Sequence, residues 1–530
     1  MSVVRFRLSA PVPYLDMKEA LEAVLSTAIQ RKTDISFRLE RPKNPKMGDY
    51  ASTLAFQKAK EIGMAPPALA AEWAELLSQD ADVQSWVDVS VAGPFLNFKL
   101  TDQRLWTQFK TVLDSPYQLE SKDPVCLEYV SANPTGPLHI GHGRWAAIGD
   151  ALARILRYAG TNLHTEFYIN NAGTQIQVFL ESIKAAKNGD PVPENGYGGE
   201  YIEDLAALNL EDPVGHMQEQ HKAVLSSMGV DFDQWFSEKS LHDGEKIPAA
   251  MQVLKDIDLA YEADSALWFR STAFDDDKDR VLIKSDGAYT YFAVDIAYHL
   301  EKLERNFHSL ITILGADHHG YLKRLTAVLE ALATSRNHGI KIQWILGQLV
   351  QLVRGDQPVR LSKRKGDIVT LESLIEEIGV DATRYFLIEK TADHVLTVDL
   401  ELAKTQSNEN PVFYVQYAHA RLSRLLEKWE TDIPNPSDAI AFEDAERNLL
   451  LLAARFQDLI AELVQDLDPS KLSAYLTSLA KAFHSFYQAC PVMSAESDAH
   501  KQQRVFICYQ LREIFRQGLD LLGVSAPNRM

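Results

Sequence analysis

Two histidines and a glycine stand where the sequence predicts a strand to end and a helix to begin. They lie in the tetrapeptide His139-Ile140-Gly141-His142. The first turn of a helix carries backbone N–H groups that have no partner within the helix, and the helix dipole makes this end positive. Two imidazoles add donors, and Gly141 lets a flat base approach the main chain. The tetrapeptide therefore predicts a site for phosphate, and for a nucleotide that carries it.

A cationic loop about 220 residues later suits the same ligand. Four of the six residues from Arg360 to Lys365 are lysine or arginine, in a chain whose formal charge is −19. A run of charges is usually a solvated surface. Here Ser362 and the following Gly366-Asp367 favour a mobile loop that grips phosphate, with Lys363 as a movable point charge.

The elements around the tetrapeptide are typical of a parallel α/β sheet. An apolar run at 125–130 predicts a buried strand, apolar positions from 145 to 156 recur at helical spacing, and 163–169 predicts a second strand. Strand, helix and strand in this order form a parallel crossover unit. Because open α/β sheets bind ligands at the carboxyl ends of their strands, His139 and His142 fall where a ligand is expected.

The sheet is expected to resume at 281–283 and again at 310–314, and an apolar strand is expected at 345–353. The strand at 310–314 ends in a polar turn that contains Asp317 and His318. An aspartate beside two histidines invites a metal site. Adjacent residues of one turn seldom reach the same ion, and no third ligand is spaced for it, so contact with the nucleotide is the favoured interpretation.

The length of 530 residues predicts about three domains. Residues 1–120 predict a separate α/β unit with a basic, proline-rich loop at 41–50, which suits a solvated turn and a phosphate contact about equally. Residues 121–405 hold the parallel sheet, interrupted by a stretch at 186–280 that is rich in Gly, Pro and acidic residues and looks like an insertion. Residues 406–530 carry long apolar stripes at helical spacing and predict a helical bundle.

The composition predicts a soluble, cytoplasmic protein. The sequence shows no apolar run long enough to span a bilayer and no signal peptide. Its three cysteines, Cys126, Cys490 and Cys508, are odd in number and far apart, which argues against a disulfide framework and against a cysteine-based zinc site. The negative charge argues against non-specific coating of nucleic acid, but leaves room for an enzyme with local basic patches.

The tetrapeptide and the cationic loop together resemble the two ATP motifs of class I aminoacyl-tRNA synthetases. They occur in the expected order, and a helical domain follows them. Further segments resemble arginyl-tRNA synthetases in particular, so that the resemblance covers essentially the whole chain: Arg41–Ala51, Val91–Pro94, Ser131–Leu138, Gly379–Tyr385, Asn410–Arg421 and Ser525–Met530. The loop departs from the general pattern at Arg360 and Leu361, which stand where that pattern has Lys and Met. Lys363 is present, so activity is expected.

The resemblance implies a Rossmann-like parallel-sheet catalytic domain (121–405), an N-terminal additional tRNA-recognition domain (1–120) and an all-α anticodon-binding bundle (406–530). It implies that ATP converts L-arginine to arginyl-adenylate with release of pyrophosphate. The arginine then passes to the 3′-terminal adenosine of tRNA(Arg). Activation is expected to need bound tRNA. Mg²⁺ is expected to come with ATP, and the protein is expected to be a monomer that makes no membrane contact and has no protein-ligated zinc.

The resemblance also implies roles for single residues. Catalysis is expected from His139, His142 and Lys363. ATP is expected to contact His139, Gly141, His142, Asp317, His318, Ser362, Lys363 and Arg364. Arginine is expected to contact Glu128, Asn133, Tyr291, Asp295 and His318, with Tyr291 and Asp295 offering a fork to the guanidinium. Candidate tRNA contacts are Lys43, Lys46, Tyr414, Gln416 and Arg421, the last three from an exposed helix face that could stack on unpaired bases.

Two other functions fit part of the sequence. A small-molecule adenylyltransferase shares the tetrapeptide, but it leaves the length, the cationic loop and the bundle unexplained. A catalytically silent paralogue that binds tRNA or acts as a scaffold is the second alternative, and the intact His139, His142 and Lys363 count against it. Aminoacylation of tRNA would distinguish a synthetase from the first alternative. Absence of ATP–pyrophosphate exchange would favour the second.

Overall fold

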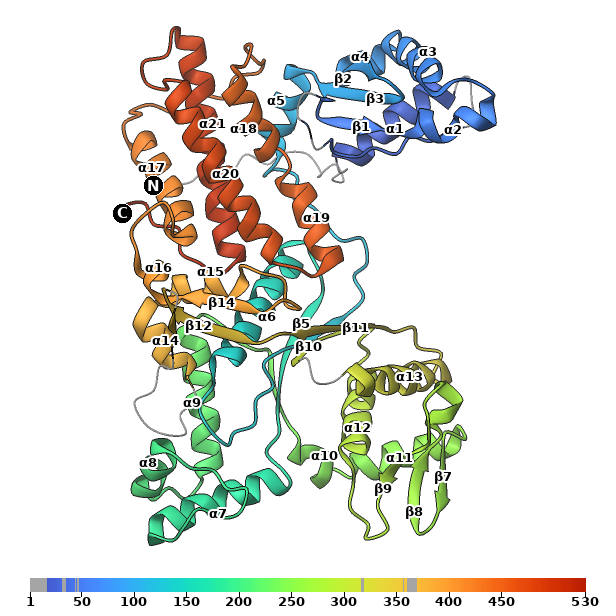
Figure 1. Cartoon of the computed structure of the whole chain (residues 1–530), viewed down its shortest axis with the longest axis vertical. Coiled ribbons are helices and arrows are strands. Elements are labelled where there is room, and N and C mark those ends of the chain that lie inside the picture. The colour runs from blue at the N-terminus through green and yellow to red at the C-terminus, as the bar shows by residue number, and fades with distance from the viewer. Residues whose placement is uncertain are drawn as a thin grey trace.

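The computed structural model describes residues 17–30, 35–42, 44, 47–315, 319–355, 357–359 and 369–530. Figure 1 shows an N-terminal α/β unit in blue, a central sheet with its helices, and a helical bundle in orange and red. This architecture confirms the predicted α/β class with a parallel sheet and a C-terminal all-α part. Within these residues, no helix combines the length and the apolar character that a membrane crossing requires.

The N-terminal unit packs helices on a small antiparallel sheet. The sheet has the order β1-β3-β2, with β1 at Tyr50–Ser52, β2 at Val87–Ala92 and β3 at Phe95–Leu100. β2 and β3 pair as a hairpin around Gly93, as two apolar runs separated by a turn predict. The helices are α1 (Met17–Gln30), α2 (Leu54–Ile62), α3 (Pro66–Ser78), α4 (Ala81–Trp86) and α5 (Asp102–Thr111).

Five parallel strands form the central sheet, in the order β11-β10-β4-β5-β6. Their bounds are β4 (Val125–Glu128), β5 (Leu163–Ile169), β6 (Gln234–Ser237), β10 (Ser309–Gly315) and β11 (Lys341–Gly347). Helix α6 (Ile140–Tyr158) connects β4 to β5 and completes the predicted crossover unit. The chain continues from β4 to β5 on one side and later places β10 on the other. The strand order therefore reverses at β4, where such sheets bind ligands.

The region 186–280, expected to be one insertion, is divided by a strand of the central sheet. Helices α7 (Thr174–Asn188), α8 (Glu200–Leu208) and α9 (Pro213–Ser227) precede β6 and share a small apolar core. Strand β6 itself joins the central sheet beside β5. Its four residues, Gln234-Trp235-Phe236-Ser237, are too few to show the periodicity of a strand, so this strand was not predictable from its local pattern.

A second small sheet forms where the central sheet was expected to resume. After β6 come α10 (Lys239–Asp243), α11 (Lys246–Asp256), β7 (Ala260–Ala263), β8 (Ala266–Phe269), the short η2 (Ser271–Phe274) and β9 (Arg280–Ile283). β9 pairs with β8 in an antiparallel sheet, so the expectation for 281–283 is wrong. A nearby partner needs a shorter loop closure than a distant one. Helices α12 (Tyr291–Glu304) and α13 (His319–Ser335) then flank β10.

The apolar segment 345–353 forms parts of two strands rather than one. β11 ends at Gly347, where the indole of Trp145 lies so close that a Cβ would not fit. The chain then enters β12 (Val350–Arg354) of a separate sheet, in which β13 (Gln357–Pro358) and β14 (Leu396–Asp399) are its neighbours. Helices α14 (Leu371–Ile378), α15 (Val380–Ile388) and α16 (Leu400–Lys404) complete this region, with α15 and α16 packed against β14.

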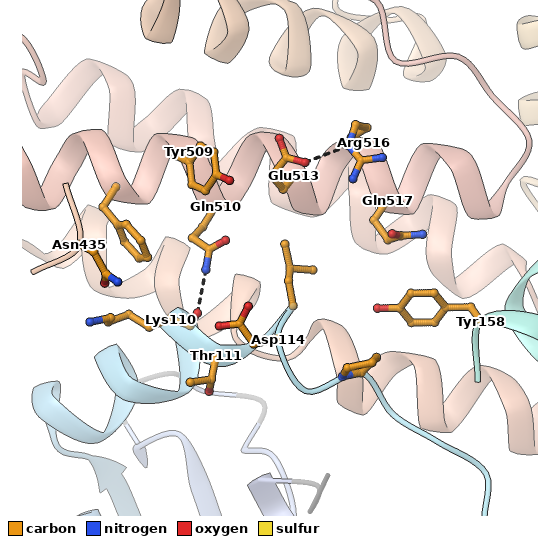
Figure 2. A pocket seen from close by; sticks show the side chains of 13 residues that line it. Lys110, Thr111, Asp114, Tyr158, Asn435, Tyr509, Gln510, Glu513, Arg516 and Gln517 are labelled. Carbon is orange, nitrogen blue, oxygen red and sulfur yellow. Dashed lines mark hydrogen bonds and ion pairs between the residues drawn. The ribbon is translucent and has the colours of Figure 1, made fainter. Parts of the chain in front are cut away.

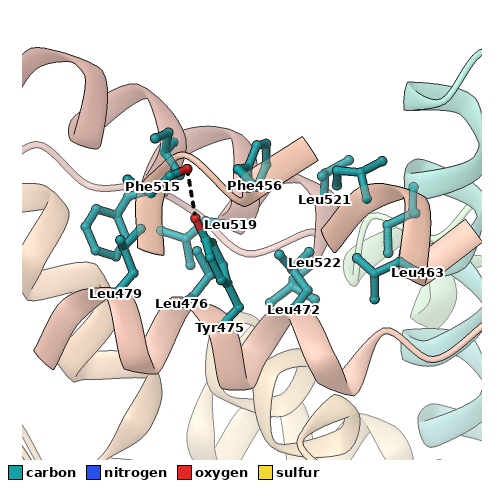
Figure 3. Packing of buried hydrophobic residues seen from close by; sticks show 14 of the residues in the cluster. Phe456, Leu463, Leu472, Tyr475, Leu476, Leu479, Phe515, Leu519, Leu521 and Leu522 are labelled. Atoms are coloured by element: carbon teal, nitrogen blue, oxygen red, sulfur yellow. Dashed lines mark hydrogen bonds between the residues drawn. The ribbon is translucent and has the colours of Figure 1, made fainter. Parts of the chain in front are cut away.

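The C-terminal helices form the predicted bundle. They are α17 (Pro411–Glu427), α18 (Asp444–Ala453), α19 (Phe456–Asp466), α20 (Ser470–Ala489) and α21 (Asp498–Leu521). Figure 3 shows the core between them, where Leu472, Tyr475 and Leu476 lie opposite Leu519 and Leu522. A Cβ at Gly518 would lie 2.6 Å from a methyl of Leu476, so glycine permits the close approach of α21 to α20.

Candidate active site

A cavity of about 240 Å³ opens at the carboxyl ends of β4, β5 and β10, between α12 and α13. It lies where the strand order reverses. Three of the residues predicted to contact arginine line it together: Glu128, Asn133 and Asp295. The other polar side chains of its wall are Ser131, Tyr168, Asn170, Tyr298, His299, Thr312 and Tyr321.

The chain bends sharply where β4 meets this cavity. Val130 and Ser131 have φ angles of +71° and +44°, a region that a β-branched valine rarely adopts. The bend turns the hydroxyl of Ser131 back, so that it donates to Oε1 of Glu128 (2.9 Å) and accepts the N–H of Tyr168 (3.1 Å). Backbone strain of this kind persists only where surrounding contacts enforce it, and it concentrates at functional sites.

Glu128 has the ionic partner that a buried acid requires. Its Oε2 accepts from Nζ of Lys302 (2.5 Å) and from the hydroxyl of Tyr298 (3.0 Å). Burial alone would lower the pKa of Lys302, but the charges of Glu128 and Glu166 together outweigh it and raise that pKa to about 12. The neighbouring Glu166 is paired in the same way with Arg305 (2.6 Å). Two of the carboxylates around the cavity, those of Glu128 and Glu166, are therefore already paired with a cationic side chain of the protein.

Asp295 also faces the cavity, but in a different electrostatic environment. It is half-buried on α12, and its carboxylate accepts a hydrogen bond from the hydroxyl of Tyr321. Burial, together with the nearby charge of Glu128, raises the pKa of Asp295 to about 7. The charge of Glu238 also raises the pKa of Asp295, and Glu238 itself accepts from the hydroxyl of Tyr168 (2.7 Å). Both carboxyl groups accept hydrogen bonds from tyrosine hydroxyls, and a bound cation would be their natural partner.

Sequence reasoning missed several of these side chains. Tyr298 and Lys302 follow Asp295 by three and seven residues, which places all three on one face of α12. That spacing was the available signal. Glu238 and Tyr321 stand on separate segments, and no local pattern links them to the site.

Tyr291 does not reach the cavity wall. Its side chain is 67% exposed at the start of α12, one turn before Asp295. The tyrosine hydroxyl that contacts Asp295 belongs to Tyr321 instead. The side-chain amide of Asn133 lies at the cavity and donates to Gln175.

The histidine pair lies at the start of α6 and caps it reciprocally. Nδ1 of His139 accepts from the backbone N–H groups of Gly141 (3.1 Å) and His142 (3.3 Å), while Nδ1 of His142 accepts from the N–H of His139 (3.3 Å). The two rings stack with their centroids 3.6 Å apart. A Cβ at Gly141 would lie 2.9 Å from the His139 ring, so the cap itself requires this glycine.

The cap corrects one expectation about this helix start. Free N–H groups were expected to receive phosphate here. The N–H of Ile140 is bonded to the carbonyl of Val369 (3.2 Å), and those of Gly141 and His142 are bonded to His139. Since the imidazoles replace the backbone as the outward donors, any phosphate at this point would meet the side chains.

The hydrogen bonds of the pair define its protonation. Because both Nδ1 atoms accept, each neutral ring carries its proton on Nε2. Burial lowers the pKa of both imidazoles, and with the neighbouring His139 and His221 it lowers that of His142 to about 2. The pair therefore offers two neutral Nε2–H donors.

The chain that follows the cationic loop returns to the histidine pair. The N–H of Leu371 donates to the carbonyl of Leu138 (2.7 Å), and Thr370 forms a β-bridge with His139. Val359, on the other side of the loop, is bonded to Leu352 of β12 (2.9 Å). Five predicted ATP-site residues lie outside the described part of the chain: Asp317, His318, Ser362, Lys363 and Arg364.

A larger cavity of about 500 Å³ lies between α5, the segment after it, and α21. Figure 2 shows its side chains paired with neighbours: Arg516 donates to Glu513 (2.9 Å) and Gln510 to the carbonyl of Lys110 (2.8 Å). None of the described residues that line it belongs to the predicted site. The smaller cavity, at the strand ends, is the better candidate.

The predicted tRNA contacts have different environments. Lys43 and Lys46 lie outside the described residues. Gln416 is buried, with its amide donating to Asp381 (2.8 Å) and to the carbonyl of Ser525 (2.9 Å), so the expectation that it is exposed is wrong.

The other two residues of this face remain half-exposed. Tyr414 and Tyr417 flank His484, with ring centroids 5.0 and 5.9 Å from it, and Arg421 lies 3.9 Å from the ring centroid of Tyr487.

The described residues contain no group of three or more His, Cys, Asp or Glu side chains that could hold a metal ion.

Three family models match the chain and together span nearly all of it. Residues 15–100 match the arginyl tRNA synthetase N terminal domain. Residues 109–211 and 214–427 match the class I (R) tRNA synthetase catalytic domain. Residues 415–530 match the DALR anticodon binding domain.

Whole-chain relatives agree with these matches. An arginine–tRNA ligase of Kineococcus radiotolerans is 40% identical over 526 residues, which cover 93% of this chain and 94% of the relative. A Campylobacter jejuni structure assigned as an arginyl-tRNA synthetase is 32% identical, with a TM-score of 0.73 over 81% of this chain and all of that one. The arginyl-tRNA synthetase of Thermus thermophilus, 22% identical, shares the fold with a TM-score of 0.79 over 97% of this chain and all of that one.

Proposed function

Because this chain belongs to the arginyl-tRNA synthetase family and is an arginine–tRNA ligase, we propose that the cavity at the ends of β4, β5 and β10 binds the substrate arginine. The observation that carries this proposal is Asp295, a half-buried carboxylate whose described partner is the hydroxyl of Tyr321. A carboxylate withdrawn from water needs a cation or several donors, and a guanidinium supplies both.

The two ends of arginine are assigned to different walls of the cavity. Asp295 holds the guanidinium, and the hydroxyl of Tyr321 orients its carboxylate. Glu128 and Asn133 hold the α-ammonium. A carboxylate has about four acceptor positions, and Ser131, Tyr298 and Lys302 use three of those on Glu128. One position remains for the substrate.

The reaction uses ATP and needs no nucleophile from the protein. The carboxylate of arginine attacks the α-phosphorus of ATP, the bond from that phosphorus to the bridging oxygen breaks, and pyrophosphate leaves. The terminal hydroxyl of tRNA(Arg) then attacks the carbonyl carbon of arginyl-adenylate, and AMP leaves. The protein contributes positioning and stabilisation of developing charge.

His139 and His142 are assigned to the phosphate oxygens on which negative charge develops. Each would donate from Nε2, because Nδ1 is used within the cap. Neutral donors stabilise the transition state without a change of protonation. Gly141 keeps the main chain near the adenine.

The remaining nucleotide contacts are proposed from the resemblance and from the position of the flanking chain. Lys363 holds the leaving pyrophosphate, with Ser362 and Arg364 supporting the loop. Asp317 and His318 meet the ribose or the substrate edge, and Mg²⁺ accompanies the phosphates of ATP. The bonds from Val369 and Leu371 to the start of α6 support this arrangement, since they bring the end of the loop to the histidine pair.

Arginine-dependent ATP–pyrophosphate exchange, measured with and without tRNA(Arg), tests the function and the site separately. Exchange is expected with arginine and to depend on tRNA. Asp295→Asn is expected to raise KM for arginine about 100-fold, since losing one partner of a buried charge pair costs roughly 3 kcal/mol. The matched control is Asp286→Asn, an exposed aspartate in the turn before α12. An unchanged KM in Asp295→Asn would reject the site, and exchange with another amino acid but not with arginine would reject the specificity.

The domain roles are proposed on the same basis. Residues 1–120 recognise tRNA, with Lys43 and Lys46 on its phosphates, residues 121–405 carry catalysis, and residues 406–530 bind the anticodon. Tyr414 and Arg421 would contact unpaired bases, because aromatic and guanidinium planes stack on them. The protein is proposed to act in the cytoplasm as a monomer. Light scattering of the purified protein would check the oligomeric state.

A further inference from the structure

Two side chains from the helices between β5 and β6 hydrogen-bond to the turn that leads into α6. Tyr201 on α8 donates its hydroxyl to the carbonyl of Thr135 (3.1 Å). His221 on α9 donates its Nε2–H to the carbonyl of Gly136 (2.8 Å). Two successive carbonyls of one turn, 133–138, are therefore held from outside the central sheet.

His221 occupies a core position of its helix. Met217, His221 and Leu225 follow one another at four-residue spacing and are 1%, 2% and 0% exposed. A leucine would pack in such a stripe without the cost of burying a polar ring. Packing alone does not account for a histidine here, whereas the hydrogen bond to the carbonyl of Gly136 does.

Tyr201 packs directly over the same turn. A Cβ at Gly136 would lie 3.4 Å from the end of the tyrosine ring. A small cavity of about 110 Å³ lies beside the contact, between Pro137, Thr370 and His221. The turn has space on that side into which it could shift if it were not held.

Helix α9 is itself fixed to α6 at a second point. The carbonyl of Met228, at its C-terminal end, accepts from Arg384 (2.8 Å), and Arg384 is paired with Asp150 on α6 (2.5 Å). α9 therefore braces the middle of α6 against the turn that precedes it.

We propose that Tyr201 and His221 are positioning residues for amino-acid activation. They hold the turn 133–138 in the place that aligns the Nε2–H donors of His139 and His142 with the α-phosphate. This inference rests on the proposed role of the histidine pair. The carboxylates assigned to arginine, those of Asp295 and Glu128, lie outside this turn. Only Asn133, at its start, belongs to both, so arginine binding depends on these two hydrogen bonds less than the alignment of the histidine pair does.

The test is steady-state exchange kinetics of the full-length protein, with thermal unfolding of each variant. Tyr201→Phe and His221→Leu are each expected to lower kcat about 10-fold, since small displacements of positioned groups are costly. KM for arginine should stay within about 2-fold, as the carboxylates assigned to it lie outside the turn. His221→Gln can still donate an N–H at this reach and should recover most of kcat.

Matched controls come from the same helices. Tyr197→Phe changes a tyrosine that packs against Phe179 in the small core, and His216→Leu changes a histidine of α9 that contacts Gln220. Both should keep wild-type kcat. The inference is overturned if Tyr201→Phe keeps full kcat, or if His221→Gln is no better than His221→Leu and the loss follows the melting temperature.

These outcomes are separable from failure of the proposed function. Absence of arginine-dependent exchange in the wild-type protein would reject the function itself. If His221→Leu does not fold, Tyr201→Phe decides, because it removes one hydroxyl and keeps the ring that packs on Gly136.

Discussion

The carboxyl group of Asp295 suits a bound cation, and in the ligand-free protein it lowers the stability of the folded state at high pH. Burial and the charge of Glu128 raise its pKa to about 7, whereas an unfolded aspartate titrates near pH 4. The folded protein therefore binds this proton more tightly than the unfolded chain does. The contribution of this group to stability is present at low pH and is lost as the pH rises through about 7.

Asp295→Asn is therefore expected to stabilise the arginine-free protein at pH 8. A rise of roughly 1–3 °C in melting temperature is reasonable for such a change, and the difference from wild type should shrink as the pH falls towards 4. Saturating arginine should raise the melting temperature of wild type but not of the variant. Scanning fluorimetry without ligand, beside Asp286→Asn, provides the measurement. An equal or lower melting temperature of Asp295→Asn at pH 8 would contradict the electrostatic account of this pocket.

Single residues show where local patterns stop being informative. The place of His139 and His142 at a helix start was predictable, because the apolar strand and helix around them are. Their reciprocal cap was not, since Ser, Thr, Asp and Asn are the usual capping residues and the orientation of a ring depends on its neighbours in space. Glu128 is paired with Lys302, which lies 174 residues away. Nothing in the sequence connects the two.

At the scale of elements, the position of α6 on β4 decides where the histidine pair lies. Gly149 on α6 faces Tyr129, just after β4, and a Cβ there would overlap the tyrosine ring. Tyr129 is fully buried, so the ring cannot move aside. The close approach of helix to strand therefore depends on glycine at this position.

Gly149→Ala is expected to push α6 away from β4. Overpacking of this kind costs about 1–3 kcal/mol of unfolding free energy, and the displaced histidine pair should lower kcat of exchange as well. Urea unfolding and exchange kinetics measure the two effects. Gly339→Ala is the matched control, because no atom lies within 4 Å of its added Cβ. Wild-type stability of Gly149→Ala would show that the helix tolerates the shift and that the argument is wrong.

The elements that were predictable share a physical property. β4 and β10 lie within a parallel sheet and are largely buried, so they appear as continuous apolar runs. β6 is too short and too mixed to give this signal, and β9 is apolar yet pairs with its neighbour β8. The stripe from 449 to 463 continues through a break at 454–455 that divides α18 from α19. Periodicity reports which face is buried, but not which partner buries it.

At the scale of the molecule, the N-terminal unit is fixed to the distant bundle. Arg447 on α18 donates to both carboxylate oxygens of Asp49 (3.1 and 2.6 Å) and to the carbonyl of Leu100 (2.9 Å). Trp106 of α5 packs among Phe442 and Phe506, with ring centroids 6.2 and 5.5 Å away. Figure 1 shows the result, in which the two terminal parts lie side by side above the central sheet. A tRNA held by both parts would depend on this contact.

Arg447→Met is expected to lower stability by about 3 kcal/mol, because it leaves the carboxylate of Asp49 buried without its cation. The double variant Asp49→Asn/Arg447→Met should be less destabilised than the sum of the single changes, since the unpaired charge is removed. Affinity for tRNA(Arg) should fall in Arg447→Met. KM for arginine should not change, because the residues assigned to arginine lie at the strand ends of the central sheet. Urea unfolding of the four proteins and filter binding of tRNA measure these effects. Additive losses in the double variant would show that the pair does not couple the N-terminal unit to the bundle, and unchanged tRNA affinity would show that the two parts bind tRNA without needing this contact.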